Sequence, residues 1–434
     1  MKISIVGAGW AGLTAAVAAT EAGHHATVFE AAHAIGGRAR ALKGLLPDGT
    51  PVLLDNGQHI LIGAYTETLR LMRQVGVDPQ ATLARLPLTL QFPDGSGLAL
   101  PAWPGPLDAL AGILTARGWT WGDRWSLIKT AARWQRAGFT CAPQASVAEL
   151  CRALTPQIMA TLVDPLCISA LNTPSERASG QVFLRVLHDA LLGGQGSSNL
   201  LLPTTDLTQL FPQTAAQWLL ARGGVVHTGT PARSLGWNDG GWLVNGDPYD
   251  AVIWATSASN AAAAITQHAQ TAPDSIADPM RRWAGEAQAL QFEAIATVYA
   301  YAAGLRLPQP MLALPSDLEH PAQFVFDRGQ LGGRSGLLAF VVSASHCERD
   351  LLQTLVLAQA HEQLARHLQG RSLTSLQTVV EKRATFACTP DLQRPPQAIA
   401  PHLFACGDYT KGPYPATLEG AVRSGVAAAQ ALNP

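Results

Sequence analysis

The chain has 434 residues and a formal net charge of −1, and its mean hydropathy is +0.11. A chain of this length is too long for one simple core, so we expect two domains. The near-zero charge argues against nucleic acid as a partner. Charged residues make up 14%, below the roughly 25% usual for soluble proteins, so the excess apolar surface requires a large core, an apolar ligand tunnel or a membrane face.

The six cysteines are scattered without a CxxC pair. This pattern predicts neither a disulfide framework nor a metal site, and it is typical of a protein in a reducing cytoplasm. Lys2 and the apolar residues after it superficially resemble a secretory signal peptide. Apart from this N-terminal stretch, no run is apolar and long enough for a spanning helix. We therefore expect any contact with a membrane to be peripheral.

The first strand and helix enclose a glycine motif that is typical of dinucleotide binding. Residues 3–6 predict a buried strand, and the helix expected over residues 13–22 follows the sequence GAGWAG. In this motif Gly7 permits a tight turn, Gly9 lets the backbone approach a pyrophosphate, and Gly12 lets the helix pack close to the strand. The N–H groups of the helix N-terminus, including that of Ala11, then stabilise the phosphate charge.

A second strand over residues 26–29 ends on Glu30, and Gly36, Gly37 and Arg38 come soon after it. Glu30 stands where a carboxylate can accept hydrogen bonds from ribose hydroxyls. It would also repel a 2′-phosphate, so NADP is an unfavourable occupant. Glycines with a purely structural role are the alternative, but the strand, the helix and the acid at the correct spacing favour the nucleotide.

Three later segments have the pattern of the same nucleotide-binding unit. They cover residues 53–60, residues 207–255, which begin with a helix over 207–222, and residues 403–425. Between them lie a mainly helical stretch and a stretch that alternates strands over 294–301, 323–327 and 337–343 with a helix over 349–368. We expect an α/β fold in which a Rossmann-like FAD-binding domain, of the glutathione-reductase or amine-oxidase type, is interrupted by a mixed α+β substrate domain. The expected FAD-binding domain comprises residues 1–85, 205–260 and 383–434, and the expected substrate domain comprises 86–204 and 261–382.

This set of motifs resembles the FAD-dependent amine oxidase and phytoene desaturase superfamily. Within the superfamily, residues 54–60 (LDNGQHI), 199–203 and 412–421 (GPYPATLEGA) resemble the hydroxysqualene dehydroxylases. The resemblance covers both ends and the middle of the chain. It implies FAD as the cofactor and the reductive removal of the allylic hydroxyl of hydroxysqualene to give squalene, in squalene and hopanoid synthesis.

The resemblance also implies cofactor contacts. Arg38 is expected at the pyrophosphate region, Ala232 at the adenine edge in place of the family's usual valine, and Asp408 at the ribityl or pyrophosphate oxygens. The helix that starts near Thr417 and Leu418 is expected to direct its N–H groups at the flavin N1 edge, where they stabilise the reduced anion. The full expected set of cofactor residues is Gly7, Gly9, Ala11, Gly12, Glu30, Gly36, Gly37, Arg38, Asn56, Gly57, Ala232, Gly407, Asp408, Thr417, Leu418 and Ala421.

Dehydroxylation requires a proton that converts the hydroxyl into water, and so a titratable donor near the flavin. His59 is the first candidate because imidazole titrates near neutral pH, although it can equally serve only as a hydrogen-bond partner. Asp55 and Glu419 are the second candidates, since burial in an apolar pocket can keep a carboxyl protonated. Asp55 can also simply fix a turn.

The substrate implied is a C30 isoprenoid, which resides in the bilayer, so the protein needs an opening towards a membrane. Residues 103–139 hold five tryptophans with interleaved arginine and lysine, the composition of an interfacial anchor; a helical core is the equal alternative. We expect a cytoplasmic protein at the inner face of the cytoplasmic membrane. The electron donor is not identified by the sequence.

Two other functions stay open. A carotenoid or phytoene-type desaturase or saturase would use the same flavin and a similarly long substrate. A non-enzymatic prenyl-lipid carrier of related fold would bind lipid without a flavin, which the complete cofactor set (Glu30, Arg38, Asp408 and the Thr417 helix) disfavours.

Overall fold

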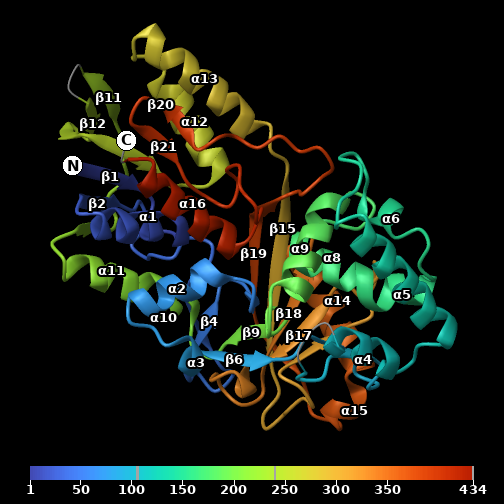
Figure 1. Ribbon diagram of the computed structural model, residues 1–434. Helices are drawn as coiled ribbons and strands as arrows, with labels where there is room; N and C mark the ends of the chain where they lie inside the picture. The colour runs from blue at the N-terminus through green and yellow to red at the C-terminus, as the bar shows by residue number, and fades with distance from the viewer. Residues whose placement is uncertain (104–106, 239–240, 433–434) are drawn as a thin grey trace.

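The computed structural model describes residues 1–103, 107–238 and 241–432. Its first sheet has six strands in the order β10-β2-β1-β14-β21-β20, and every pair is parallel except β20 with β21 (Figure 1). The strands are β1 (Lys2–Val6), β2 (His25–Phe29), β10 (Val225–His227), β14 (Ala251–Trp254), β20 (Ala398–Ala400) and β21 (Leu403–Ala405). Segments from the start, middle and end of the chain thus form one sheet, as the sequence predicts.

Helix α1 (Trp10–Glu21) follows β1 directly and packs against α16 (Leu418–Gln430). Nine of its twelve residues are buried, and most of these are small, which allows the helices to approach closely. The helix begins at Trp10 rather than at Leu13, because Gly9 already has the extended conformation of an N-cap. The helices α2 (Thr66–Gln74), α10 (Leu207–Leu210), α11 (Pro212–Leu220), α12 (Ala258–His268) and α13 (Asp274–Gln288) complete this part of the molecule.

The second sheet has five antiparallel strands in the order β16-β17-β18-β15-β19. They are β15 (Phe292–Tyr301), β16 (Met311–Ala313), β17 (Phe324–Asp327), β18 (Leu337–Ser343) and β19 (Thr374–Phe386). All seven residues of β18 are buried, because α14 (Arg349–Gln363) and α15 (Ala365–Leu368) share a core with one face of the sheet. The other face belongs to the core that continues towards the first sheet.

The helical stretch contains α4 (Leu107–Thr115), α5 (Trp121–Arg136), α6 (Val147–Leu150), α7 (Pro156–Ile158), a π-helical turn η1 (Met159–Val163), α8 (Asp164–Leu171) and α9 (Gly180–Leu192). Figure 1 shows α4, α5 and α6 at the edge of the molecule remote from the first sheet. The remaining short elements are β3 (Ala41–Leu45), β4 (Pro51–Asp55), β5 (Leu61–Ile62), α3 (Pro79–Thr82), β6 (Leu83–Leu86), β7 (Thr89–Gln91), β8 (Gly97–Ala99), β9 (Leu200–Pro203), β11 (Leu235–Asn238), β12 (Gly241–Val244), β13 (Asp247–Tyr249) and η2 (Arg328–Gln330).

Several sequence-predicted elements differ in detail. The helix expected over 207–222 is divided between α10 and α11 at Phe211, because Pro212 has no N–H to continue the first helix. The helix expected over 349–368 is likewise interrupted at Leu364. Three expected domain boundaries fall inside elements, 85/86 within β6, 260/261 within α12 and 382/383 within β19. The division into domains therefore stays a prediction.

Candidate functional site

A cavity of about 580 Å³ lies at the carboxyl ends of β1, β2, β14 and β21. In parallel α/β sheets this edge is the usual ligand site, and the volume is within the range of small-molecule pockets. The cavity continues to the face of the second sheet, where β15, β17 and β18 contribute lining residues. One space therefore joins the two sheets.

The glycine turn after β1 forms the inner wall. Gly7 has a φ of +112°, and a Cβ there would lie 2.9 Å from the carbonyl oxygen of Ala255. A Cβ on Gly37, at a φ of +60°, would lie 3.3 Å from the Cα of Gly9, so the two backbones close one side of the cavity together. Gly12 is not a lining residue: its Cβ would lie 1.9 Å from the oxygen of Gly7. Its contact is with the turn, as expected for a packing glycine.

Glu30 borders the cavity at the end of β2. Its carboxylate accepts hydrogen bonds from the backbone N–H groups of Ala8 at 2.8 Å and Ala32 at 2.9 Å. The carboxylate thus holds the glycine turn against the loop that follows β2.

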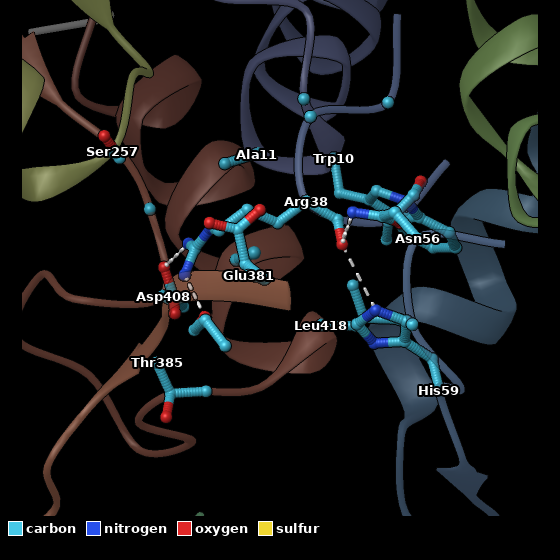
Figure 2. Close-up of a pocket in the computed structure, with 18 of the residues that line it drawn as sticks. Trp10, Ala11, Arg38, Asn56, His59, Ser257, Glu381, Thr385, Asp408 and Leu418 are labelled. Atoms are coloured by element: carbon cyan, nitrogen blue, oxygen red, sulfur yellow. Dashed lines mark hydrogen bonds and ion pairs between the residues drawn. The ribbon is translucent and has the colours of Figure 1, made fainter. Parts of the chain in front are cut away.

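Arg38 and Asp408 are 370 residues apart in sequence and form an ion pair at 2.5 Å. The guanidinium also donates to the backbone oxygen of Ala384 on β19. Figure 2 shows Arg38 reaching across the site towards Asp408, with Glu381 and Thr385 nearby. The N-terminal segment, the C-terminal segment and the second sheet therefore meet at Arg38.

The loop after β4 forms another wall. Asn56 donates from Nδ2 to the backbone oxygen of Arg38 at 2.8 Å and accepts the N–H of Arg40 at 2.9 Å. His59 places Nε2 3.3 Å from the same oxygen of Arg38 (Figure 2). Burial lowers the pKa of His59 to about 4, so at neutral pH the neutral ring can donate its Nε2–H to that carbonyl. Gly57, between these two residues, also lines the cavity.

The N-terminus of α16 opens on the cavity. Its N-cap is Thr417, whose hydroxyl accepts the N–H of Gly420 at 2.9 Å. Leu418 and Ala421 line the space, and so do Gly36, Ala11, Ala232 and Gly407 from other segments. Of the expected cofactor residues, all except Gly12 border this one cavity.

Two of the three expected proton donors do not line the cavity, and both expectations need correction. The carboxylate of Glu419 is fully buried and accepts from the N–H groups of Glu67 and Thr68, from the Thr68 hydroxyl and from Arg423. It caps α2, so its oxygens are already used.

Asp55 accepts the N–H of Leu207 at 2.9 Å and faces Arg328 at 3.4 Å. Burial raises the pKa of Asp55 to about 6, which the positive charge of Arg328 opposes. The carboxyl is thus easily protonated, but it contacts the start of α10 and η2 instead of the cavity. Of the three candidates, His59 alone borders the cavity.

Several lining residues were missed from the sequence. Thr256 and Ser257 stand between β14 and α12, so a third helix, besides α1 and α16, begins at the cavity edge. The sequence has a signal for these residues, because a buried strand is followed by the start of a helix here, as it is after β1. Glu381 on β19 carries no comparable signal, because its position depends on the pairing of β19 with β15.

The end of the cavity remote from the glycine turn is mostly apolar. Its lining there comes from the second sheet and α8, namely Ile295, Phe324, Phe326, Val341, Ala170 and Leu171. Asn172 and Ser343 are buried polar residues in this lining, and the side chain of Asn172 is held by Thr385 and the N–H of Ala344. An apolar end and a polar, glycine-walled end therefore belong to one pocket.

Comparison with known proteins assigns this architecture. The sequence pattern of flavin containing amine oxidoreductases matches residues 10–433. A hydroxysqualene dehydroxylase of Sinorhizobium fredii is 25% identical over 99% of this chain and 97% of its own length, and one of Rhodopseudomonas palustris is 27% identical over 98% and 97%. An oxidoreductase from Methanosarcina mazei has the same fold, with a TM-score of 0.72 at 17% identity over 99% of this chain and 100% of that one.

The fold and the cavity are those of a flavin-dependent oxidoreductase. The chain belongs to the flavin containing amine oxidoreductase family.

The residues present fit a flavin nucleotide, because the N-termini of α1 and α16 and a glycine wall without side chains border the same cavity. In the described parts of the chain, no helix has the length and apolar character needed to cross a membrane. Nor do those parts contain a cluster of three or more metal-ligating side chains.

Proposed function

We propose that this protein is an FAD-dependent hydroxysqualene dehydroxylase, which reductively removes the hydroxyl of hydroxysqualene to give squalene. The observation that carries the proposal is the single cavity with a glycine-walled nucleotide end and an apolar end. The relatives named hydroxysqualene dehydroxylase align with nearly the whole chain and cover nearly their own whole length, which supports the same assignment.

At the nucleotide end, Glu30 would accept hydrogen bonds from the ribose hydroxyls. The N-terminus of α1 would stabilise the pyrophosphate charge. Arg38 and Asp408 bracket the middle of the cavity, where pyrophosphate and ribityl oxygens need a cation and an acceptor. The N–H groups at the start of α16 would lie along the flavin ring, where positive dipole density stabilises negative charge. FAD, unlike a flavin without the adenosine half, would contact both Glu30 and the start of α16.

Bound in its reduced form, the flavin supplies a hydride. The hydroxyl would leave as water after it gains a proton from a residue of this chain, and the carbon that bore it would take up the hydride. His59 is the proposed proton donor, because its ring borders the cavity next to Arg38. Its low pKa makes the imidazolium a strong acid but a scarce one at neutral pH.

The proposed role of His59 predicts a pH profile. Since the protonated fraction decreases tenfold for each pH unit above the pKa, kcat/KM should rise as the pH falls from 7 towards 5. His59→Gln should lose this rise together with most of its activity. A profile that is flat in both proteins would remove His59 from the role of acid.

The apolar end suits a C30 isoprenoid. Transfer of about thirty carbons from water would favour binding by roughly 20 kcal/mol, but such a molecule resides in the bilayer, and transfer from lipid gains little. We therefore propose that the substrate enters from a membrane surface and that the protein works at the inner face of the cytoplasmic membrane. The electron donor that reduces the flavin is unidentified.

One experiment tests the assignment. The flavin extracted from the purified protein is identified by mass, and the dithionite-reduced protein is then incubated anaerobically with hydroxysqualene. We expect FAD and the formation of squalene, with no product from phytoene and an electron acceptor. Turnover of phytoene alone would instead indicate a desaturase or saturase, and a protein without bound flavin would indicate a prenyl-lipid carrier.

A further inference from the structure

Two neighbouring helices at the edge of the molecule expose large apolar side chains. On α4, Leu107, Leu110 and Leu114 are 61%, 44% and 42% exposed and follow the spacing of one helix face. On α5, Trp121 and Trp125 are 72% and 58% exposed. Trp103, just before α4, is 59% exposed, while residues 104–106 lie outside the described parts. We call these six residues, together with the exposed cations Lys129, Arg133 and Arg136 of α5, the α4/α5 surface.

The exposed stripe of α5 continues from tryptophan into positive charge. One side of the helix carries Trp121, Trp125, Lys129, Arg133 and Arg136 in sequence, and all are exposed. The Lys129 ammonium lies 5.5 Å from the Trp125 ring centre. This order of aromatic and basic residues along one face is typical of helices that lie at a membrane interface.

The acidic residues of this segment do not oppose that charge. Asp123 is buried and caps α5 together with Thr120. Asp108 is half-buried, and its side chain accepts the N–H of Ala109. Within the described residues of 103–139 the exposed charges are therefore all positive, which favours an anionic partner.

The other two tryptophans of the segment are core residues. Trp119 and Trp134 are 5% and 7% exposed, and the indole of Trp119 donates to Thr161 at 3.0 Å. The helical-core interpretation is therefore correct for these two tryptophans, and the anchor interpretation stays a prediction for the exposed ones. Two of the five anchor the segment, and three are left on the surface.

The same contact connects the surface to the cavity. Thr161 belongs to η1, which continues without a break into α8, and the end of α8 lines the apolar part of the cavity through Ser169, Ala170 and Leu171. A π-helical turn within a helix is often found at functional sites. A continuous helical segment, η1 and α8, therefore runs from the Trp119 contact to the proposed substrate end of the cavity.

We infer that the α4/α5 surface docks on an anionic phospholipid bilayer. Trp103, Trp121, Trp125 and the leucines of α4 would enter the interfacial region, where indole rings are favoured. Lys129, Arg133 and Arg136 would contact anionic headgroups. The inference rests on the proposed function for its purpose, the delivery of a lipid substrate, but not for its test.

The test uses the flavin-loaded full-length protein and sedimentation with vesicles of phosphatidylcholine containing 0 to about 40% phosphatidylglycerol, a range over which surface potential should increase binding. We expect binding that rises with phosphatidylglycerol content and falls with salt. Trp121→Gln/Trp125→Gln should reduce vesicle binding at least about tenfold. Lys129→Gln/Arg133→Gln/Arg136→Gln should reduce it by about fivefold per cation on anionic vesicles only. The matched control is Leu220→Gln/Val225→Gln, two exposed apolar positions on α11 and β10, which should bind as the wild type does.

Flavin content and squalene formation from detergent-dispersed substrate are measured in the same variants. Retained turnover in detergent with lost vesicle binding supports the inference, and absent turnover in every protein defeats the proposed function while the vesicle result still stands. Equal vesicle binding by the tryptophan variant and the wild type would overturn the inference. So would sedimentation velocity showing a wild-type dimer that the tryptophan variant cannot form, with no vesicle binding by either, since the surface would then be an interface between copies.

Discussion

At the scale of single residues, the environment of a side chain decides its chemistry more than its type does. His59, Asp55 and Glu419 are all titratable and all near the nucleotide motifs in sequence. In the structure His59 borders the cavity, Asp55 contacts Arg328 and Leu207, and Glu419 caps α2. Sequence spacing identifies the loop that holds His59, but the direction of a pKa shift depends on burial, which spacing does not reveal.

The low pKa of His59 predicts a pH dependence of stability. In the unfolded chain the ring titrates near its usual 6.5, and in the folded protein near 4. Protons therefore bind the unfolded state more tightly, so the free energy of unfolding decreases as the pH falls from 6.5 to 4. Above pH 6.5 His59 causes no such loss. The loss is at most about 3 kcal/mol, because the ring borders the cavity. Urea unfolding at pH 7 and 4.5 should show a smaller loss of stability for His59→Gln than for the wild type. His361→Gln, at an exposed position on α14, should keep the wild-type loss, and equal losses in all three proteins would refute the prediction.

At the scale of elements, the contact of α1 with α16 brings the two ends of the chain together. A Cβ on Gly425 would lie 2.4 Å from the backbone oxygen of Ala11, on the turn of α1 that borders the cavity. The glycine spacing in both segments is visible in the sequence and led to the correct sheet and helices. The break at Phe211–Pro212 has a local signal that the predicted helix ignored, since Pro212 has no N–H to continue it. The order of the second sheet has no such signal, because it depends on long-range packing.

We expect Gly425→Ala to lower the free energy of unfolding by about 1–3 kcal/mol, since the methyl group must push the two helices apart. Flavin retention should fall with it. Gly285→Ala is the matched control, because Gly285 is also helical, on α13, and a Cβ there meets nothing within 4 Å. That variant should be neutral or up to about 1 kcal/mol more stable. Similar effects of the two alanines in denaturant titrations would contradict the close packing.

At the scale of the whole molecule, a buried hydrogen-bond network joins β15 of the second sheet to β4 and the loop that follows it. The Tyr299 hydroxyl on β15 donates to the backbone oxygen of Asp55 at 2.7 Å and accepts from the N–H of Asp55 and from Gln58. Arg328 from η2 reaches Gln58 and Asp55 as well. The sequence predicts each strand involved, but not that a tyrosine 244 residues away would fix the loop of Asn56 and His59.

Tyr299→Phe should destabilise the protein by about 2–3 kcal/mol, because it leaves buried backbone groups of Asp55 without a partner. Flavin should dissociate at lower denaturant concentrations than in the wild type, since the loop borders its proposed site. Tyr301→Phe, on the same strand and outside this network, is the comparison. If the two variants unfold alike, the network does not couple the second sheet to the loop of Asn56 and His59.

The central claim is that the apolar substrate meets the flavin within the one cavity between the two sheets. It is tested most directly by mixing dithionite-reduced protein anaerobically with hydroxysqualene in a single turnover, in the wild type and in Val341→Trp, which fills the apolar end. We predict one squalene formed for each flavin oxidised in the wild type. Val341→Trp should keep its flavin and its reduction by dithionite but form squalene at least about tenfold more slowly, while Leu351→Trp, at an exposed site on α14, should react normally. Squalene formed without flavin oxidation, or an unchanged rate in Val341→Trp, would contradict the account.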